Sequence, residues 1–311
     1  MVGAVPAPIE ASATVNGVSL TYFEWGREHG GDPILLAHAT GFHARCWDQV
    51  VAHLGRRRVI AVDQRGHGRS DKVARVRWQE LGRDLAELVC RLDLHDVVGV
   101  GHSAGGHAMT EAAALEPTRF RRLVLIDPTI LAPDAYAARG SQGAGAWVQV
   151  AGNSHPAAKR RRHFTSIDEM IARLQDRPSF ASFTPAALRD YCTWGLVPCT
   201  DPAGFELACS PEMEGAVYSA ALGNPAIHEH VHVVGIPVLV VRAMEPRTPE
   251  DLADFRYSPT WPALAARFPH GRDVYRPDRT HFMPMEDPAL TAALILDGTI
   301  DGNTTNSTRR S

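Results

Sequence analysis

The sequence predicts an α/β fold: a mostly parallel eight-stranded sheet with helices on both faces and a helical cap inserted after the sixth strand. Short, continuously apolar runs alternate with helical patterns, which is typical of sheets whose strands are buried on both faces. The alternation stops near Pro128 and resumes near Ile236, which indicates an insertion. A length of 311 residues is sufficient for one large α/β domain that carries such an insertion.

The elements before the insertion alternate between strand and helix. Two β-prone segments flank Asn16-Gly17, a pair that favours a tight hairpin turn. Apolar runs then predict four buried strands, at Pro33–His38, Arg58–Asp63, Asp96–Gly101 and Arg121–Asp127. Apolar residues at helical spacing predict helices at Cys46–Leu54, Trp78–Leu94 and His107–Glu116.

The insertion itself is rich in proline, glycine and aromatic residues. Two helical pieces are predicted in it, at Ser166–Gln175 and Pro185–Trp194. After it we predict a strand, a helix, a strand and a last helix, at Ile236–Arg242, Thr260–Phe268, Asp273–Tyr275 and Asp287–Leu296. We therefore expect a core of residues 1–130 and 235–298, a cap of residues 131–234 and a disordered tail of residues 299–311.

Composition excludes several classes of protein. The formal net charge of −3 does not favour a nucleic-acid partner, and the apolar runs are too short for a membrane helix. Met1–Ala13 has no basic region followed by an apolar one, so we expect no secretory signal and a cytoplasmic protein. The five cysteines are scattered without paired spacing, which argues against a disulfide framework or a zinc site. No phosphate-binding glycine motif follows a strand, so we expect no nucleotide, metal or organic cofactor and a small-molecule substrate.

The most informative motif is Gly101-His102-Ser103-Ala104-Gly105. It lies between a predicted strand and a predicted helix. A sharp turn in this context raises a serine hydroxyl to the edge of a sheet, where a histidine can reach it. Side chains at Gly101 and Gly105 would collide with neighbouring backbone in so tight a turn. We interpret Ser103 as a candidate nucleophile.

Three further blocks accompany this motif in a fixed order. They are His38-Ala39-Thr40-Gly41-Phe42, the block Asp63–Ser70, and Thr280-His281-Phe282. Together with the Ser103 turn they make the chain resemble the α/β-hydrolase superfamily over nearly its whole length. The resemblance implies that His281 is the general base for Ser103. We interpret the block Asp63–Ser70 as structural, because its glycines suit a tight turn that Asp63 and Arg65 can hold.

The resemblance also implies a carboxylate that orients His281. Family members commonly place it after the strand predicted at Ile236–Arg242, which makes Glu245 the preferred candidate. Some members take it from the end of the sixth strand, where this chain has Asp127, and Asp251 is a third alternative. The order serine, acid, histidine along the chain fits all three.

The remaining site predictions concern the oxyanion hole and the pocket. The backbone N–H groups of Ala104 and Thr40 are expected to bind the oxyanion. We expect His38, His102 and Trp194 at the substrate pocket, with His38 bracing the oxyanion loop and His102 packing beside the site. Most aromatic residues of the cap should form its own core, while a few line an apolar pocket; they are Trp147, Phe164, Phe180, Phe183, Tyr191 and Trp194.

A short basic run, Lys159–His163, is expected on a solvated helix face. The alternative is that it attracts an anionic substrate or partner.

Three functions follow from the resemblance. The preferred one is a serine hydrolase that cleaves carboxylic esters or lactones of small to medium apolar substrates through an acyl-enzyme. The second is a carbon–carbon bond hydrolase acting on diketone-type ring-cleavage products, although such relatives generally carry Gly-Asn-Ser where this chain has Gly101-His102-Ser103. The third is a ligand receptor without turnover on the same fold. An acyltransferase would require a cap that excludes water.

Overall fold

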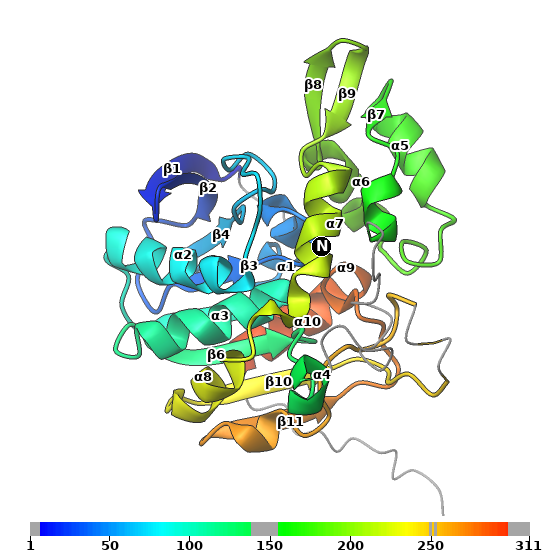
Figure 1. Ribbon diagram of the computed structural model, residues 1–311. Coiled ribbons are helices and arrows are strands. Elements are labelled where there is room, and N and C mark those ends of the chain that lie inside the picture. The colour runs from blue at the N-terminus through cyan, green and yellow to red at the C-terminus, as the bar shows by residue number, and fades with distance from the viewer. Residues whose placement is uncertain (1–6, 138–154, 249–250, 252–253, 298–311) are drawn as a thin grey trace, which may run out of the picture.

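Eight strands form the main sheet of the protein (Figure 1). In a computed structural model of the chain, residues 7–137, 155–248, 251 and 254–297 are described. The strands are β1 (Ile9–Val15), β2 (Val18–Trp25), β3 (Ile34–Ala37), β4 (Val59–Val62), β5 (Val97–His102), β6 (Phe120–Ile126), β10 (Val238–Arg242) and β11 (Gly271–Tyr275).

The strand order is β1-β2-β4-β3-β5-β6-β10-β11. β1 pairs antiparallel with β2, and β2 pairs antiparallel with β4, whereas every later pair is parallel. Asn16 and Gly17 turn the opening hairpin, both with positive φ (44° and 77°). The predicted mostly parallel eight-stranded sheet is confirmed.

Helices cover both faces of this sheet, as predicted. One face carries α2 (Trp78–Arg91), α3 (Ala104–Leu115) and α8 (Ile227–Val233); the other carries α1 (Asp48–Val51) and α10 (Pro288–Asp297). Successive side chains of a strand point to opposite faces of the sheet. In β3, Leu35 packs in the layer beneath α2, α3 and α8, and Leu36 packs in the layer beneath α1 and α10. This double burial explains why the strands are continuously apolar in sequence.

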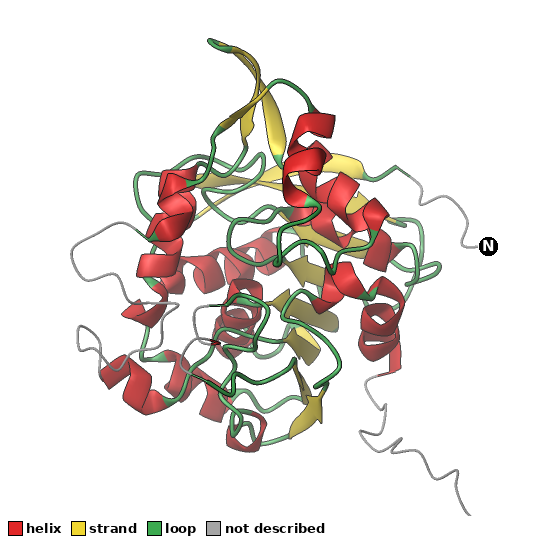
Figure 2. Cartoon of the chain, turned by 90° about the vertical axis from the view of Figure 1, so that its right-hand side faces the viewer, coloured by secondary structure: helices red, strands yellow, loops and turns green. Residues whose placement is uncertain are grey.

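The insertion after β6 contains strands as well as helices. Its described elements include a three-stranded antiparallel sheet, which projects above the main sheet in Figure 2. The elements are α4 (Pro133–Ala137), η2 (Pro156–Lys159), β7 (His163–Phe164), α5 (Ile167–Leu174), α6 (Pro185–Trp194), β8 (Leu196–Thr200), β9 (Ala203–Leu207), α7 (Pro211–Ser219) and η3 (Ala221–Gly223). The insertion after the sixth strand thus carries helices, as predicted, and also a small antiparallel sheet that the sequence did not indicate.

Helix starts in the cap follow the expected chemistry. Thr184 caps α6 by accepting a hydrogen bond from the backbone N–H of Ala187, and proline occupies the first helical position. Ser166 caps α5 and Ser210 caps α7 in the same way. At the other end of the insertion, α8 packs on α3 through Ile227 and Val231, which belong to the hydrophobic layer of the main sheet. The structure thus places α8 with the core, although the sequence assigned it to the cap.

After β10, the structure differs from the sequence prediction in one helix. A helix is predicted at Thr260–Phe268, but only the short η5 (Ala265–Arg267) forms there. The reason lies in Thr260, whose hydroxyl hydrogen-bonds to the end of β6, and in Pro262, which interrupts the helical pattern. The short α9 (Met283–Glu286) and then α10 complete the fold. The predicted tail, residues 299–311, lies outside the described residues.

The turn after β4 confirms its structural interpretation. The buried carboxylate of Asp63 accepts hydrogen bonds from the backbone N–H groups of Ala44 (2.6 Å) and Arg69 (2.8 Å). Arg65 forms a two-pronged pair with Asp84 of α2, at 2.6 Å for each contact. Asp63 thereby ties this turn to the loop that follows β3.

No helix in the described part of the chain is both long and apolar enough to span a membrane.

Candidate active site

Ser103 occupies a strained turn between β5 and α3. Its φ and ψ are 56° and −117°, a conformation that few non-glycine residues adopt. A Cβ atom at Gly101 would lie 2.3 Å from the carbonyl oxygen of Gly105, and one at Gly105 would lie 2.2 Å from that of Ala37. The glycines on either side of Ser103 are therefore required by backbone packing, as the sequence indicated.

We expect Gly105→Ala to destabilise the protein by about 3 kcal/mol or more, because the new methyl group meets rigid backbone. The matched control is Gly223→Ala, where a Cβ atom meets nothing within 4 Å. That control should leave stability unchanged or raise it by about 0.5 kcal/mol. Urea denaturation of both variants measures the difference. Equal midpoints would contradict the close packing at Gly105.

His281 pairs with Asp127. The Nδ1–H of His281 donates to Asp127 Oδ2 at 2.6 Å, and both side chains are almost completely buried. The other carboxylate oxygen, Oδ1, accepts from the backbone N–H of Ala243 at 3.1 Å and from the hydroxyls of Ser258 and Thr260. Because every oxygen has a donor, Asp127 is held in one orientation and holds His281 in turn.

The preferred acid of the sequence analysis is corrected by this geometry. Glu245 is not the partner of His281, because its carboxylate forms an ion pair with Arg242 at the end of β10. The second alternative, Asp251, is also engaged elsewhere and accepts backbone hydrogen bonds from Arg247 and Thr248. Asp127 directly follows β6, the strand beside β5, whereas Glu245 lies beyond β10, one strand farther along the sheet.

The segment that follows β6 also brings a side chain to Ser103. Thr129 lies two residues beyond Asp127, and its Oγ1 is 3.0 Å from the Oγ of Ser103. Its backbone N–H also donates to the carbonyl of Ser103, at 3.0 Å. Sequence analysis missed Thr129, as well as Ser258 and Thr260 on Asp127, because no local motif marks them.

The two predicted oxyanion donors lie on either side of the Ser103 turn. Ala104 is the first residue of α3, where the helix dipole favours negative charge, and Thr40 lies in the loop after β3. Neither backbone N–H donates to an acceptor within the described residues. Both groups are thus available for an oxyanion.

His38 braces the Thr40 loop. Burial lowers the pKa of His38 to about 3, so its ring is neutral. Its Nε2 accepts from the backbone N–H of Gln64 at 3.0 Å, and its Nδ1–H donates to the carbonyl of Ala39 at 2.7 Å. This is the bracing contact that the sequence indicated, but it leaves His38 outside the lining of the cavity described below.

The other two predicted pocket residues also lie outside that lining. The Nε2–H of His102 donates to the backbone carbonyl of His281 at 2.8 Å. This hydrogen bond connects the loop that carries His281 to the Ser103 turn. Trp194 faces Arg45 and Arg69, whose guanidinium carbons lie 3.8 and 4.8 Å from its ring centroid. His38, His102 and Trp194 thus make structural contacts and lie outside the lining of this cavity, and their placement at the substrate pocket stays a prediction.

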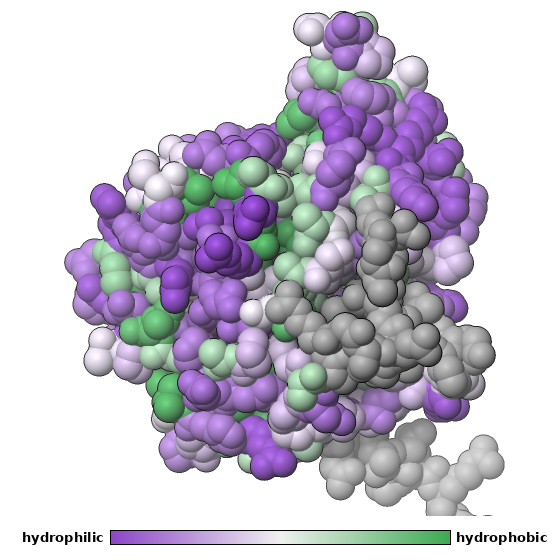
Figure 3. Space-filling view, viewed as in Figure 1, coloured by the Kyte–Doolittle hydropathy of each residue, from purple (hydrophilic) through white to green (hydrophobic). Residues whose placement is uncertain are grey.

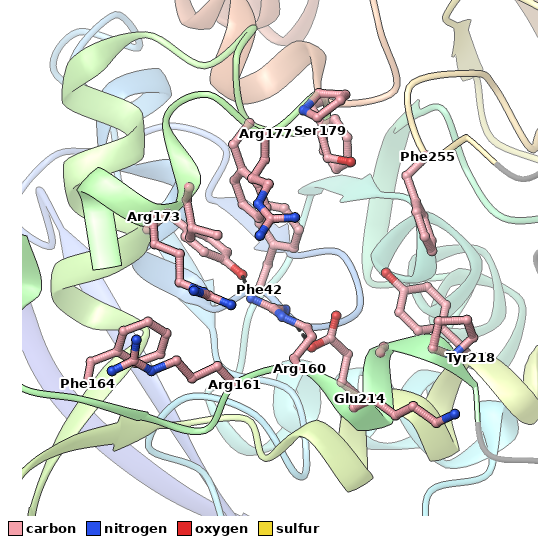
Figure 4. A pocket seen from close by; sticks show the side chains of 18 residues that line it. Phe42, Arg160, Arg161, Phe164, Arg173, Arg177, Ser179, Glu214, Tyr218 and Phe255 are labelled. Atoms are coloured by element: carbon pink, nitrogen blue, oxygen red, sulfur yellow. Dashed lines mark hydrogen bonds and ion pairs between the residues drawn. The ribbon is translucent and has the colours of Figure 1, made fainter. Parts of the chain in front are cut away.

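A cavity of about 470 Å³ adjoins the site under the cap (Figure 4). Phe42, from the Thr40 loop, stacks on Phe282 with a centroid distance of 6.0 Å, and both line the cavity. The same two rings also contact the site, Phe42 against His102 and Phe282 against His281. The stacked pair thus forms the wall that the cavity and the site share.

The aromatic residues predicted in the cap contribute to the cavity lining more than expected. Phe164, Phe180 and Tyr191 line the cavity, whereas Phe183 packs in the cap core. Trp147 lies outside the described residues.

The basic run Lys159–His163 is not a helix face. It passes from η2 into β7, and Lys159, Arg160 and Arg161 line the cavity. Arg160 is held by Glu214, with an N–O distance of 2.5 Å, and by the hydroxyl of Tyr191 at 2.9 Å. Burial raises the pKa of Glu214, an effect that the neighbouring Arg160 opposes.

No group of three or more histidine, cysteine or acidic side chains among the described residues is arranged to hold a metal ion. All five cysteines are free thiols.

Comparison with known proteins gives one family match that covers most of the chain. A model described as "Alpha/beta hydrolase family" matches residues 34–294. Among curated proteins, the chain is 28% identical over 286 residues to a 3-hydroxybutyrate-oligomer hydrolase from Cupriavidus necator, covering 88% of this chain and 90% of that one. It is 40% identical to a non-heme haloperoxidase from Rhodococcus erythropolis, but only over 29% of this chain and 33% of the relative.

Solved structures share the fold at low sequence identity. E-2-(acetamidomethylene)succinate hydrolase is similar with a TM-score of 0.70 and 24% identity, covering 93% of this chain and 97% of that one. The enol-lactonase from Burkholderia xenovorans is similar with a TM-score of 0.62 and 21% identity, covering 92% and 98%. Likeness at this level of identity speaks for the fold alone.

Proposed function

Because this chain belongs to the alpha/beta hydrolase family, we propose that it hydrolyses carboxylic esters or lactones through an acyl-enzyme on Ser103. The observation that carries the proposal is the buried pair of His281 and Asp127, which lies beside the strained Ser103 turn. Similarity over most of its length to a hydrolase named for 3-hydroxybutyrate oligomers supports the same chemistry.

In the first half of the reaction, the Oγ of Ser103 attacks the carbonyl carbon of the ester. His281 takes the hydroxyl proton on Nε2, and Asp127 keeps Nδ1 protonated and stabilises the resulting imidazolium. The oxyanion binds the N–H groups of Thr40 and Ala104. His281 then gives the proton to the leaving alcohol as the carbon–oxygen bond breaks, which leaves the acyl group on Ser103.

In the second half, water replaces the alcohol. His281 removes a proton from this water as it attacks the acyl carbon, and the same oxyanion donors stabilise the charge. Collapse of the intermediate releases the carboxylic acid and returns the proton to Ser103. The cycle consumes one water and restores the enzyme, so it requires no cofactor.

The test uses the wild-type protein with p-nitrophenyl esters from acetate to decanoate. We expect release of p-nitrophenolate with a chain-length optimum set by the cavity of about 470 Å³. A fluorophosphonate should stop turnover by phosphonylating Ser103 with loss of fluoride, and the peptide that contains Ser103 should gain the mass of the phosphonyl group. Turnover of no ester by well-folded protein would contradict ester hydrolysis and favour carbon–carbon bond cleavage. Labelling at another residue would contradict Ser103 as the nucleophile.

A further inference from the structure

We propose that the cavity contains a subsite for a free carboxylate of the substrate, formed by Arg160, Arg173 and Arg177. The inference rests on the proposed function and narrows it to a class of substrate. The preferred ester or lactone carries a second, ionised carboxyl group away from the bond that is cleaved.

The charge of the cavity lining is the first observation. Five cationic side chains line it against one carboxylate, that of Glu214; the cations are Lys159, Arg160, Arg161, Arg173 and Arg177. The chain as a whole has a net charge of −3, so this concentration of positive charge is local. Hydrophilic side chains also gather over α5 and β7 on the face shown in Figure 3. Positive charge focused in a concave site favours an anionic ligand.

Three of these cations, Lys159, Arg173 and Arg177, form no ion pair with any residue that the structure describes. Arg161 forms an ion pair with Glu169, and Arg160 forms one with Glu214. Arg173, in the last turn of α5, and Arg177, just after it, form no ion pair with any described residue. Figure 4 shows both side chains extending toward Arg160. Their guanidinium groups are therefore directed at the cavity and available to a ligand.

The contacts of Arg160 place this positive charge close to the reacting atoms. Its partner Glu214 lies against the loop that carries the oxyanion donor Thr40: a Cβ atom at Gly41 would be 2.7 Å from the Glu214 carboxyl carbon. Phe42, the next residue, is in the stacked wall between the cavity and His102. A substrate bound at Ser103 could thus extend along Phe42 toward Arg160.

A carboxylate is the group that this lining recognises best. A guanidinium presents its N–H donors in a planar fork that matches the two oxygens of a carboxylate. The aromatic side chains of Tyr191, Tyr218 and Phe255 also line the cavity, and such apolar surroundings strengthen charged contacts relative to those on an open surface. A neutral acyl chain of the same length has no charge and no hydrogen-bond acceptor at its end, so it cannot bind the guanidinium groups of Arg173 and Arg177.

The test compares two matched pairs of esters. One pair is mono-p-nitrophenyl adipate and p-nitrophenyl hexanoate, which differ by a carboxylate on the acyl side. The other is 4-carboxyphenyl hexanoate and phenyl hexanoate, which differ on the leaving-group side. We expect kcat/KM to favour the carboxylated member of at least one pair by about tenfold or more. This preference should fall as ionic strength rises.

The double variant Arg173→Gln/Arg177→Gln should lose most of the preference. The control is Arg189→Gln on α6, whose exposed arginine pairs with Asp168 and does not line the cavity, and the preference should be retained. Ratios near one for both pairs in the wild type would overturn the subsite while leaving ester hydrolysis intact. A preference unchanged in the double variant would likewise overturn the assignment to Arg173 and Arg177.

A binding measurement separates the subsite from the catalytic proposal. Calorimetry with adipate should show binding to the wild-type protein that 1,6-hexanediol, a neutral molecule of the same length, does not show. The double variant should bind adipate at least about tenfold more weakly than Arg189→Gln. If no ester is turned over but this difference is found, ester hydrolysis fails and the subsite stands. Equal binding by the two variants would overturn the subsite directly.

Discussion

Replacing Ser103 with alanine is expected to lower kcat for every ester that the wild type hydrolyses by at least about 10⁴-fold. The variant lacks the oxygen that forms the acyl-enzyme, so the reaction must proceed by direct attack of water. The oxyanion donors and the cavity remain, and they should sustain a small residual rate. Initial rates at saturating ester, measured on protein with an unchanged circular dichroism spectrum, give the ratio.

The structure supplies a control for this substitution. Ser12 lies on β1 at the edge of the main sheet, and Ser12→Ala removes the same atom far from Ser103 in strand order. This variant should hydrolyse esters at the wild-type rate. A Ser103→Ala protein with rates close to those of Ser12→Ala would show that the nucleophile is a different group. It would then leave the strained turn without a catalytic explanation.

The main sheet is predictable from the sequence for a physical reason. Its central strands are buried on both faces, so runs such as Val59–Val62 contain no polar residue and are bounded by turns. The cap strands have no such signature. β7 has two residues, and β8 contains Pro198 and alternates between buried and exposed positions in a short ribbon. Their pairing depends on contacts across the cap that no local pattern records.

The candidate site was predictable in part. Ser103 and His281 are marked by local motifs, since a tight turn needs glycine and the histidine follows the last strand. The choice between Asp127 and Glu245 depends on which carboxylate reaches His281 in space, and no local motif records that contact. Arg173 and Arg177 were missed for a similar reason. No sequence motif distinguishes these two arginines from others in the chain, and only the folded structure shows that they line the cavity.

Replacing Asp127 with asparagine is expected to lower kcat by about 10³–10⁴-fold. The carboxylate now accepts the Nδ1–H of His281 at 2.6 Å, which keeps the proton on Nδ1 and makes Nε2 the basic nitrogen of the ring. An asparagine that turns its amide N–H₂ toward the ring would select the opposite tautomer, with the proton on Nε2. The imidazolium would also lose its counter-charge. The loss should therefore appear in kcat, with a smaller change in KM.

Glu245→Gln is the matched control, because it makes the same change of carboxylate to amide at the residue that the sequence favoured. Glu245 pairs with Arg242, and its side chain is 39% exposed, so the variant should keep near-wild-type turnover. Its stability should change by no more than about 1 kcal/mol, because Glu245 is partly exposed and the buried Arg242 keeps its two contacts with Asp273. A large loss of kcat in Glu245→Gln, with near-wild-type kcat in Asp127→Asn, would make Glu245 the acid that orients His281.

The contrast is informative only for folded proteins, so urea midpoints should accompany the rates, particularly for Asp127→Asn. The buried Asp127 accepts hydrogen bonds from Ala243, Ser258 and Thr260 that its amide can meet only in part.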